Sequence, residues 1–285
     1  ATKENYGWDP DKTFYVPDEV AKFKDDMVAK GAKLEEEWNA KLKAYAEAHP
    51  DLAKQFDMMQ NGELPEGWET IIPEFPADAK GLATRESSSK ILNPIADKIP
   101  WFMGGSADLG PSTKTYIKEA SSFNREDYGG RNFHFGVREH AMGAIINGMS
   151  LSKLRPYGAT FFVFSDYVRP AIRLSSLMKQ PVVYIFTHDS IGVGEDGPTH
   201  QPVEHLASLR AMPGLDVIRP SDANELSVMW EYIMGLKDRP VALVLSRQGM
   251  PTLDRLKFAP ADGALKGAYV LIESDGTPDV ILIGT

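Results

Sequence analysis

The sequence has 285 residues, of which 42% are hydrophobic and 25% charged, and its formal net charge at pH 7 is −9. This composition is typical of a globular protein, and the negative charge argues against a nucleic-acid partner. The chain has no cysteine, which excludes a disulfide framework and a thiolate metal site, and no apolar run approaches the roughly 20 residues of a membrane span, so we expect a cytoplasmic protein with no membrane partner.

Residues 1–76 have the pattern of amphiphilic helices. A helix is predicted to start at Pro17, because two acidic residues follow in its first turn and apolar residues then recur at helical spacing, at Val20, Phe23 and Met27. Such stripes are more typical of packing faces than of binding sites. We interpret this segment as a helical lead-in and linker.

Residues 77–260 alternate between strand and helix patterns. Strands are predicted over 101–103, 132–135, 182–187, 215–218 and 241–245, with a strand and turn within 157–164. Helices are predicted over 84–99, 136–151, 203–212 and 222–234, with one more ending at residue 178. This alternation predicts an α/β domain built on a doubly wound, mostly parallel sheet.

Residues 261–285 are expected to form a linker and the first strand of a further domain. Asp279–Thr285 has the pattern of a strand followed by a glycine turn, without the helix that usually comes next in an α/β unit. The first residues also have the character of an internal segment. We therefore expect the chain to be truncated at both ends.

The loop over residues 187–202 concentrates groups that can perform chemistry. It holds two histidines, three carboxylates, three glycines and two prolines, and it follows a buried strand, where open α/β sheets place their sites. His188, Asp196 and His200 are the candidates. A metal site and a Ser/His/Asp hydrolase are both conceivable, although the short histidine spacing of common zinc motifs and a Gly-x-Ser-x-Gly elbow are missing.

Two further features have competing interpretations. Glu139 falls in the first turn of a predicted helix, where it could simply stabilise the helix dipole. The aromatic group Phe161, Phe162, Phe164 and Tyr167 could simply belong to the core. Neither feature, taken alone, establishes a site.

Taken together, the motifs resemble those of transketolases. The matching segments, in order, are 104–109, 136–140, 160–167, 187–202, 205–210, 219–222 and 246–248. The resemblance extends over essentially the entire chain. It implies the thiamine diphosphate-binding fold, and specifically the pyrimidine-binding domain with the segment that leads into it.

The resemblance implies thiamine diphosphate and a divalent metal, Mg²⁺ or Ca²⁺, as cofactors. Transketolases transfer a two-carbon ketol unit from a ketose phosphate to an aldose phosphate, in the pentose phosphate pathway and the Calvin cycle. By resemblance, Glu139 shares a proton with a ring nitrogen of the cofactor's aminopyrimidine and thereby activates it. The implied aromatic bed for that ring is Phe161, Phe164 and Tyr167, and the implied cofactor-contacting loop includes Asp108 and Leu109.

The resemblance also implies a substrate site for sugar phosphates. Arg85, Ser112, His188 and Arg247 match the sugar-phosphate clamp, and guanidinium groups suit phosphate oxygens. Asp196 matches a residue that recognises a substrate hydroxyl. His200 matches a histidine near the reacting carbon and is a candidate for proton transfer.

The metal ligands and the diphosphate-binding domain are expected outside this chain, because it contains no Gly-Asp-Gly motif. The resemblance implies a homodimer whose active site lies at the subunit interface, completed by that domain. The isolated chain is then expected to be inactive. Two other thiamine diphosphate enzymes, dihydroxyacetone synthase and deoxyxylulose phosphate synthase, stay open as alternatives, as does a non-catalytic pyrimidine-domain subunit.

Overall fold

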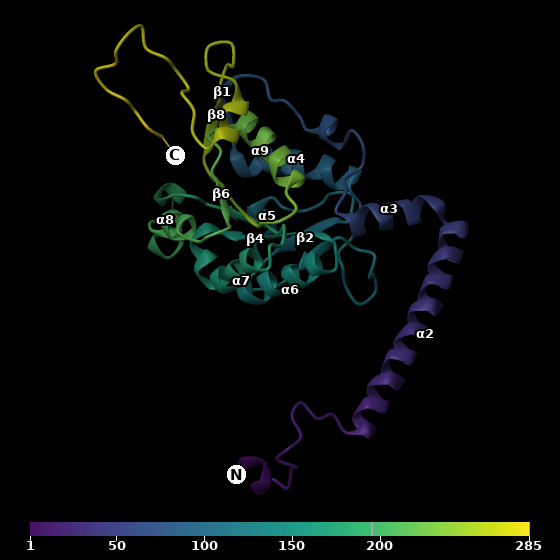
Figure 1. The fold of residues 1–285 in the computed structure, drawn as a ribbon. Helices are drawn as coiled ribbons and strands as arrows, with labels where there is room; N and C mark the ends of the chain where they lie inside the picture. The colour runs from purple at the N-terminus through teal and green to yellow at the C-terminus, as the bar shows by residue number, and fades with distance from the viewer. Residues whose placement is uncertain (195, 285) are drawn as a thin grey trace. The chain divides into compact units, whose positions relative to one another are not determined.

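The computed structural model describes residues 1–194 and 196–284. The chain separates into two compact units, Ala1–Met58 and a larger unit that begins at Met59 and includes the rest of the chain. Figure 1 colours both from the N-terminus to the C-terminus. None of the helices in the described ranges is both long and apolar enough to cross a membrane.

The first unit is helical, as the sequence predicts. It contains α1 (Thr2–Asn5), α2 (Asp18–Ala48) and most of α3 (Pro50–Asn61). α2 begins directly after Pro17, and Asp18 and Glu19 occupy its first turn. No residue of α2 is buried, so its apolar stripe is exposed in this chain.

The second unit is built on a six-stranded, fully parallel sheet in the order β3-β2-β4-β5-β7-β6. The strands are β2 (Phe102–Ser106), β3 (Asn132–His134), β4 (Arg155–Phe161), β5 (Val183–Thr187), β6 (Asp216–Ile218) and β7 (Val241–Leu245). β4, β5 and β7 are buried at every residue, which fits strands covered on both faces. The predicted α/β class is confirmed.

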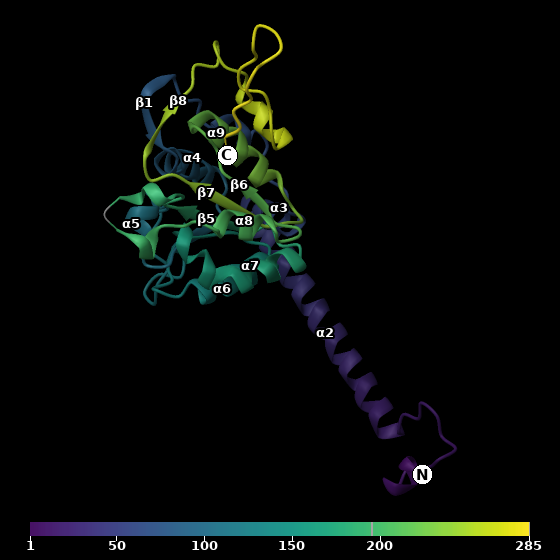
Figure 2. The same ribbon diagram turned by 90° about the vertical axis from the view of Figure 1, so that its left-hand side faces the viewer.

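Helices cover both faces of this sheet. α6 (Glu139–Leu151) and α7 (Ser165–Leu177) lie on one face, and α4 (Thr84–Lys98) and α9 (Ala223–Gly235) lie on the other (Figures 1 and 2). The short helices are α5 (Gly110–Thr113) and α8 (His205–Arg210), with 3-10 turns η1 (Trp68–Ile71), η2 (Phe162–Phe164), η3 (Ile191–Val193), η4 (Pro198–His200) and η5 (Ala261–Lys266). This is the doubly wound arrangement.

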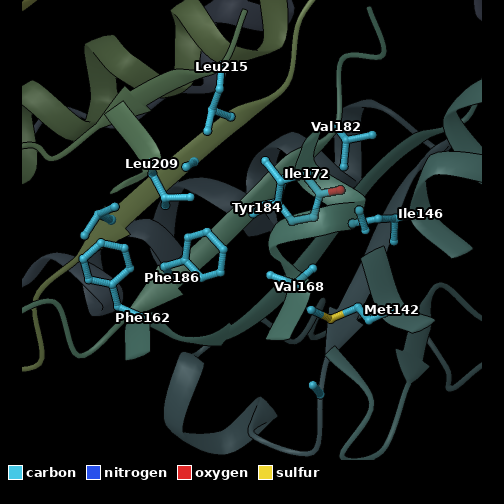
Figure 3. Close-up of a cluster of buried hydrophobic side chains, with 14 of the residues drawn as sticks. Met142, Ile146, Phe162, Val168, Ile172, Val182, Tyr184, Phe186, Leu209 and Leu215 are labelled. Atoms are coloured by element: carbon cyan, nitrogen blue, oxygen red, sulfur yellow. The ribbon is translucent and has the colours of Figure 1, made fainter. Parts of the chain in front are cut away.

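The core between the sheet and the α6–α7 layer is apolar and closely packed. Met142 of α6, Val168 of α7 and Phe186 of β5 lie in one buried cluster (Figure 3). Gly143 allows the two helices to approach, because a Cβ there would lie 2.6 Å from the Ala171 Cβ and 2.7 Å from a Val168 methyl group. Close packing of this kind makes the helix layer a rigid support for the strands of the sheet.

A small antiparallel sheet, which the sequence analysis did not predict, joins the two ends of the α/β region. β1 (Asp78–Ala83) pairs with β8 (Gly249–Thr252), with Asp78 opposite Thr252. The backbones approach so closely that a Cβ on Gly81 would lie 1.7 Å from the Met250 carbonyl oxygen. This pairing brings the start of α4 next to the segment that follows β7.

The strand predicted within 279–285 is not formed over residues 279–284, which have no regular secondary structure. Val280 and Leu282 are exposed there. An apolar run becomes a strand only when a neighbouring strand supplies hydrogen-bond partners, and the described part of the chain provides none for it.

Candidate functional site

The candidate residues gather where four neighbouring strands end. Asp108 follows β2, Phe161 ends β4, His188 directly follows β5 and Arg247 follows β7. These strands are adjacent and parallel in the sheet, so their carboxyl ends share one edge. Ligand sites of open α/β sheets lie at this edge.

His188 is held in an unusual backbone conformation. Its φ is +62°, a left-handed value that is rare for residues other than glycine and that clusters at functional sites. The residue is 3% exposed, its ring centroid lies 3.7 Å from that of Phe161, and its Nδ1 lies 2.9 Å from the Thr187 hydroxyl. The imidazole is therefore fixed against the aromatic end of β4.

Burial and two neighbouring positive charges keep His188 neutral. Burial is the main cause that lowers its pKa, to about 4, and the positive charges of Arg85 and Arg247 act in the same direction, whereas Asp196 opposes them. These groups affect one another because they lie close together. The structure thus brings His188, Arg85, Arg247, Asp196 and His200 into one electrostatic environment.

The two candidate arginines come from opposite ends of the α/β region. The Arg85 Nη1 donates a hydrogen bond to the Ser112 carbonyl oxygen at 2.7 Å, which joins α4 to α5. Burial lowers the pKa of Arg85, Glu86 raises it and Arg247 lowers it further. A Cβ on Gly194 would lie 3.8 Å from the Arg247 Nη1, which places that guanidinium beside the 187–202 loop. Two like charges held together in this way are suited to an anion.

The aromatic residues divide between the site and the core. Phe161 and Phe164 are stacked, with ring centroids 6.1 Å apart and planes 9° apart, and Tyr167 lies 6.0 Å from Phe164 with 63% of its surface exposed. Phe162, by contrast, is buried against Phe186. The turn η2 sends Phe162 into the core and leaves Phe161 and Phe164 at the site. The sequence alone does not show which of these rings lies on which side.

His200 joins the aromatic group through ring contacts. Its imidazole meets Phe161 and Phe164 edge-on, at centroid distances of 6.0 and 5.3 Å. Asp196 lies in an exposed turn of the same loop. Glu195, the carboxylate before it, lies outside the described residues.

Glu139 is the first residue of α6 and is buried, at 8% exposure. Within residues 1–194 and 196–284, its carboxylate forms no hydrogen bond or ion pair, and its oxygens are not among the enclosed polar atoms that lack a partner. The carboxylate oxygens are not enclosed, so at the start of α6 they can accept a hydrogen bond from a ligand.

The loop after β2 carries the remaining candidates. Asp108 is exposed and has a φ of +62°, whereas the Leu109 N–H donates to the Ser106 hydroxyl at 3.2 Å. The Leu109 carbonyl accepts the Ser112 N–H at 3.0 Å, which shapes α5. The backbone of this loop is thereby fixed, and it presents Ser112 to Arg85.

One site residue pair was missed by the sequence reasoning. The Arg219 Nη2 lies 2.8 Å from the Asp189 Oδ2, and the Asp189 side chain is 8% exposed. This ion pair anchors the beginning of the 187–202 loop to the segment after β6. Both residues fall within the motifs quoted above, but only the fold shows that they meet.

A group that could bind a metal lies beside this site. Asp166, Glu204 and His205 have ligand atoms within 4.8 Å of one another. The His205 Nε2 lies 3.1 Å from Asp166 and its Nδ1 accepts the Val203 N–H at 3.3 Å, so both ring nitrogens already have partners. We interpret this group as a link between α7 and α8.

Comparison with known proteins decides the family. Residues 80–252 match the family model described as the transketolase pyrimidine binding domain. The chain belongs to the transketolase family. Residues 1–65, the helical lead-in, match the model of the transketolase thiamine diphosphate binding domain, so part of that domain's sequence lies within this chain.

Individual transketolases are similar over the whole chain. The transketolase of Halalkalibacterium halodurans is 53% identical over 285 residues, which cover all of this chain and 43% of that protein. The Pichia stipitis transketolase solved with sedoheptulose-7-phosphate has a TM-score of 0.89 and 40% identity, over 96% of this chain and 41% of that one. The chain thus spans less than half the length of these transketolases.

A third similar structure is described as a split gene transketolase, an inactive beta4 tetramer. It has a TM-score of 0.50 and 30% identity, over 61% of this chain and 54% of that chain.

The thiamine diphosphate-binding pyrimidine-domain fold predicted for this chain is confirmed by the likeness to solved transketolases.

Proposed function

We propose that this chain forms the pyrimidine-binding part of an active transketolase, which transfers a two-carbon ketol unit from a ketose phosphate to an aldose phosphate. The observation that carries the proposal is the gathering of Arg85, Arg247 and neutral His188 beside the stacked rings of Phe161 and Phe164. One half of this arrangement suits a phosphorylated sugar, and the other suits an aromatic cofactor ring.

The residues present fit the aminopyrimidine end of thiamine diphosphate. Phe161 and Phe164 offer parallel rings, and Tyr167 extends them on an exposed side. Glu139 offers a carboxylate that lacks a donor in the described chain. When bound, thiamine diphosphate supplies the carbon nucleophile that carries the ketol unit. Glu139 would hold the proton that it shares with the ring nitrogen, and the loop of Asp108 and Leu109 would limit the ring's movement.

The substrate residues have distinct roles in this proposal. Arg85 and Arg247 bind the phosphate, and Ser112 orients Arg85 through its carbonyl oxygen. The His188 Nδ1 is paired with the Thr187 hydroxyl, so in the neutral ring the other nitrogen, Nε2, is the one that forms a hydrogen bond with a sugar hydroxyl. Asp196 selects the configuration of a hydroxyl, and His200, held at the edges of the aromatic rings, moves a proton at the reacting carbon.

We assign residues 1–76 to a helical lead-in, 77–260 to the pyrimidine-binding domain and 261–285 to a linker toward a further domain. The active site would lie at the interface of a cytoplasmic homodimer, with Mg²⁺ or Ca²⁺ held by the diphosphate-binding domain. The names of the similar proteins support transketolase over dihydroxyacetone synthase and deoxyxylulose phosphate synthase.

The test is ketol transfer by the thiamine diphosphate holoenzyme that contains this chain. With a ketose phosphate as donor, we expect transfer to an aldose phosphate to exceed transfer to formaldehyde. Preferred transfer to formaldehyde would instead indicate a dihydroxyacetone synthase. No transfer to either acceptor, in a folded holoenzyme that binds the cofactor, would refute catalysis and leave the non-catalytic subunit.

A further inference from the structure

Two buried hydroxyl residues stand directly before the two candidate clamp arginines. Thr84 precedes Arg85 at the start of α4, and Ser246 precedes Arg247 after β7. Thr84 is 1% exposed and Ser246 is 6% exposed. They lie 162 positions apart in the sequence and meet in the fold.

The pair is joined by reciprocal hydrogen bonds. The Thr84 N–H donates to the Ser246 Oγ at 2.9 Å, and the Ser246 N–H donates to the Thr84 Oγ1 at 2.7 Å. The Thr84 hydroxyl donates to the Ser246 Oγ at 3.1 Å, and the Ser246 hydroxyl donates to the Gln248 carbonyl oxygen at 2.9 Å. Each hydroxyl proton thus has an acceptor, so the contact has a defined geometry.

The backbone extends this contact to the arginines themselves. The Arg85 N–H donates to the Ser246 carbonyl oxygen at 3.4 Å. The two guanidiniums carry like charges, and Arg247 lowers the pKa of Arg85, which shows that each charge opposes the other. The spacing between them must be held by the chain that carries them, because the charges alone would drive them apart.

We propose that Thr84 and Ser246 are positioning residues that set the spacing of Arg85 and Arg247 for the phosphate of the sugar substrate. This inference rests on the proposed function. Both hydroxyls act through the arginines and neither touches the substrate. A misplacement of about 1 Å in a positioning group can cost a large share of an enzyme's rate or affinity, so the contact bears on substrate selection.

The decisive variant is Thr84→Val, which keeps the shape of the side chain and removes its hydroxyl. In the holoenzyme, we expect the KM for a ketose phosphate to rise by about tenfold, the loss expected for one positioned hydrogen bond, while kcat is retained. The inhibition constant of inorganic phosphate should rise by a similar factor. Kinetics with the corresponding unphosphorylated ketose should not change, and Thr84→Ser should restore the values of the original protein.

A matched control separates positioning from general packing. Ser227 is also a buried serine, on α9, and its hydroxyl donates to the Pro73 carbonyl oxygen at 2.7 Å. Ser227→Ala should leave the preference for phosphorylated donors unchanged. If Thr84→Val does not fold, Ser246→Ala, which also removes a hydroxyl from the pair, is measured in its place.

The result that overturns the inference is an equal change, or no change, with phosphorylated and unphosphorylated donors in the hydroxyl variant. A shift of the same size in Ser227→Ala would overturn it as well. Failure of the proposed function would give other results. The unsubstituted holoenzyme would transfer no ketol unit, or Arg85→Ala would leave the inhibition constant of inorganic phosphate unchanged.

Discussion

At the scale of single residues, the most informative group is the Glu139 carboxylate at the start of α6. The residue is 8% exposed, and its carboxylate oxygens, which form no hydrogen bond within the described residues, are not enclosed and can meet a ligand. A side chain kept in this state is suited to a ligand proton. The sequence alone could not separate this role from that of a helix-dipole partner, because both require an acid in the first turn.

Glu139→Ala should therefore abolish function without unfolding the protein. Loss of one acid–base contact to the cofactor should reduce ketol transfer by about 10²–10⁴-fold at saturating cofactor. The melting temperature should change little, because the carboxylate forms no hydrogen bond or ion pair within the described residues. Near-normal turnover would show that Glu139 is a structural acid only.

His188 leads to a prediction about pH. Its pKa is lowered to about 4 in the folded chain, so between about pH 6.5 and 4 the unfolded chain binds a proton that the folded chain does not. Stability from this residue is therefore complete above pH 6.5 and is lost as the pH falls toward 4.

His188→Asn is the suitable variant, because asparagine tolerates the left-handed conformation at this position. The unfolding free energy of the original chain should fall by on the order of 2 kcal/mol more than that of the variant between pH 6.5 and 4. Denaturant titrations at several pH values provide the measurement. Parallel pH profiles for the two chains would contradict the lowered pKa.

At the scale of secondary structure elements, the strands buried on both faces were predicted from the sequence, and the strands of the small sheet were not. β5 and β7 were predicted almost to the residue, because a strand covered on both faces is a continuous apolar run. β1 and β8 were missed, because one contains Asp78, Lys80 and Gly81 and the other contains Pro251. Their pairing depends on residues far away in the sequence, which no local pattern reveals.

The same limit applies to the site. The motifs identified Arg85, His188 and Arg247 singly, and their shared environment depends on the strand order. The ion pair between Asp189 and Arg219 was not predicted, because nothing in a sequence indicates which acid a given arginine will meet.

Asp222 provides a test at this scale, because it caps one element and joins it to another. It is fully buried and accepts the Glu225 N–H at the start of α9, the Leu253 N–H and the Arg255 guanidinium. Asp222→Ala should lower the free energy of unfolding by about 3 kcal/mol, since a cap is lost and Arg255 keeps a largely buried charge without that partner. Asp238→Ala, in an exposed ion pair with Arg239, should change it far less, because exposed ion pairs contribute little to stability. Equal effects in denaturant unfolding would contradict this account.

At the scale of the whole molecule, the question is what this chain can do unaided. It spans 43% of the length of a similar transketolase, and it contains no Gly-Asp-Gly motif. The purified 285-residue chain should therefore show no ketol transfer, and transfer should appear when a complementary diphosphate-binding domain is added. Turnover by the chain alone, in an assay with added cofactor and metal, would disprove this expectation.

The small sheet of β1 and β8 has one more consequence. Because Asp78 and Thr252 face each other in the register, the polypeptide enters and leaves the α/β region at the same place. A module with adjacent entry and exit points can be exchanged between related proteins as a single cassette, since neither junction has to span its body. Grafting the region whole would therefore carry with it the candidate site residues at the ends of β2, β4, β5 and β7.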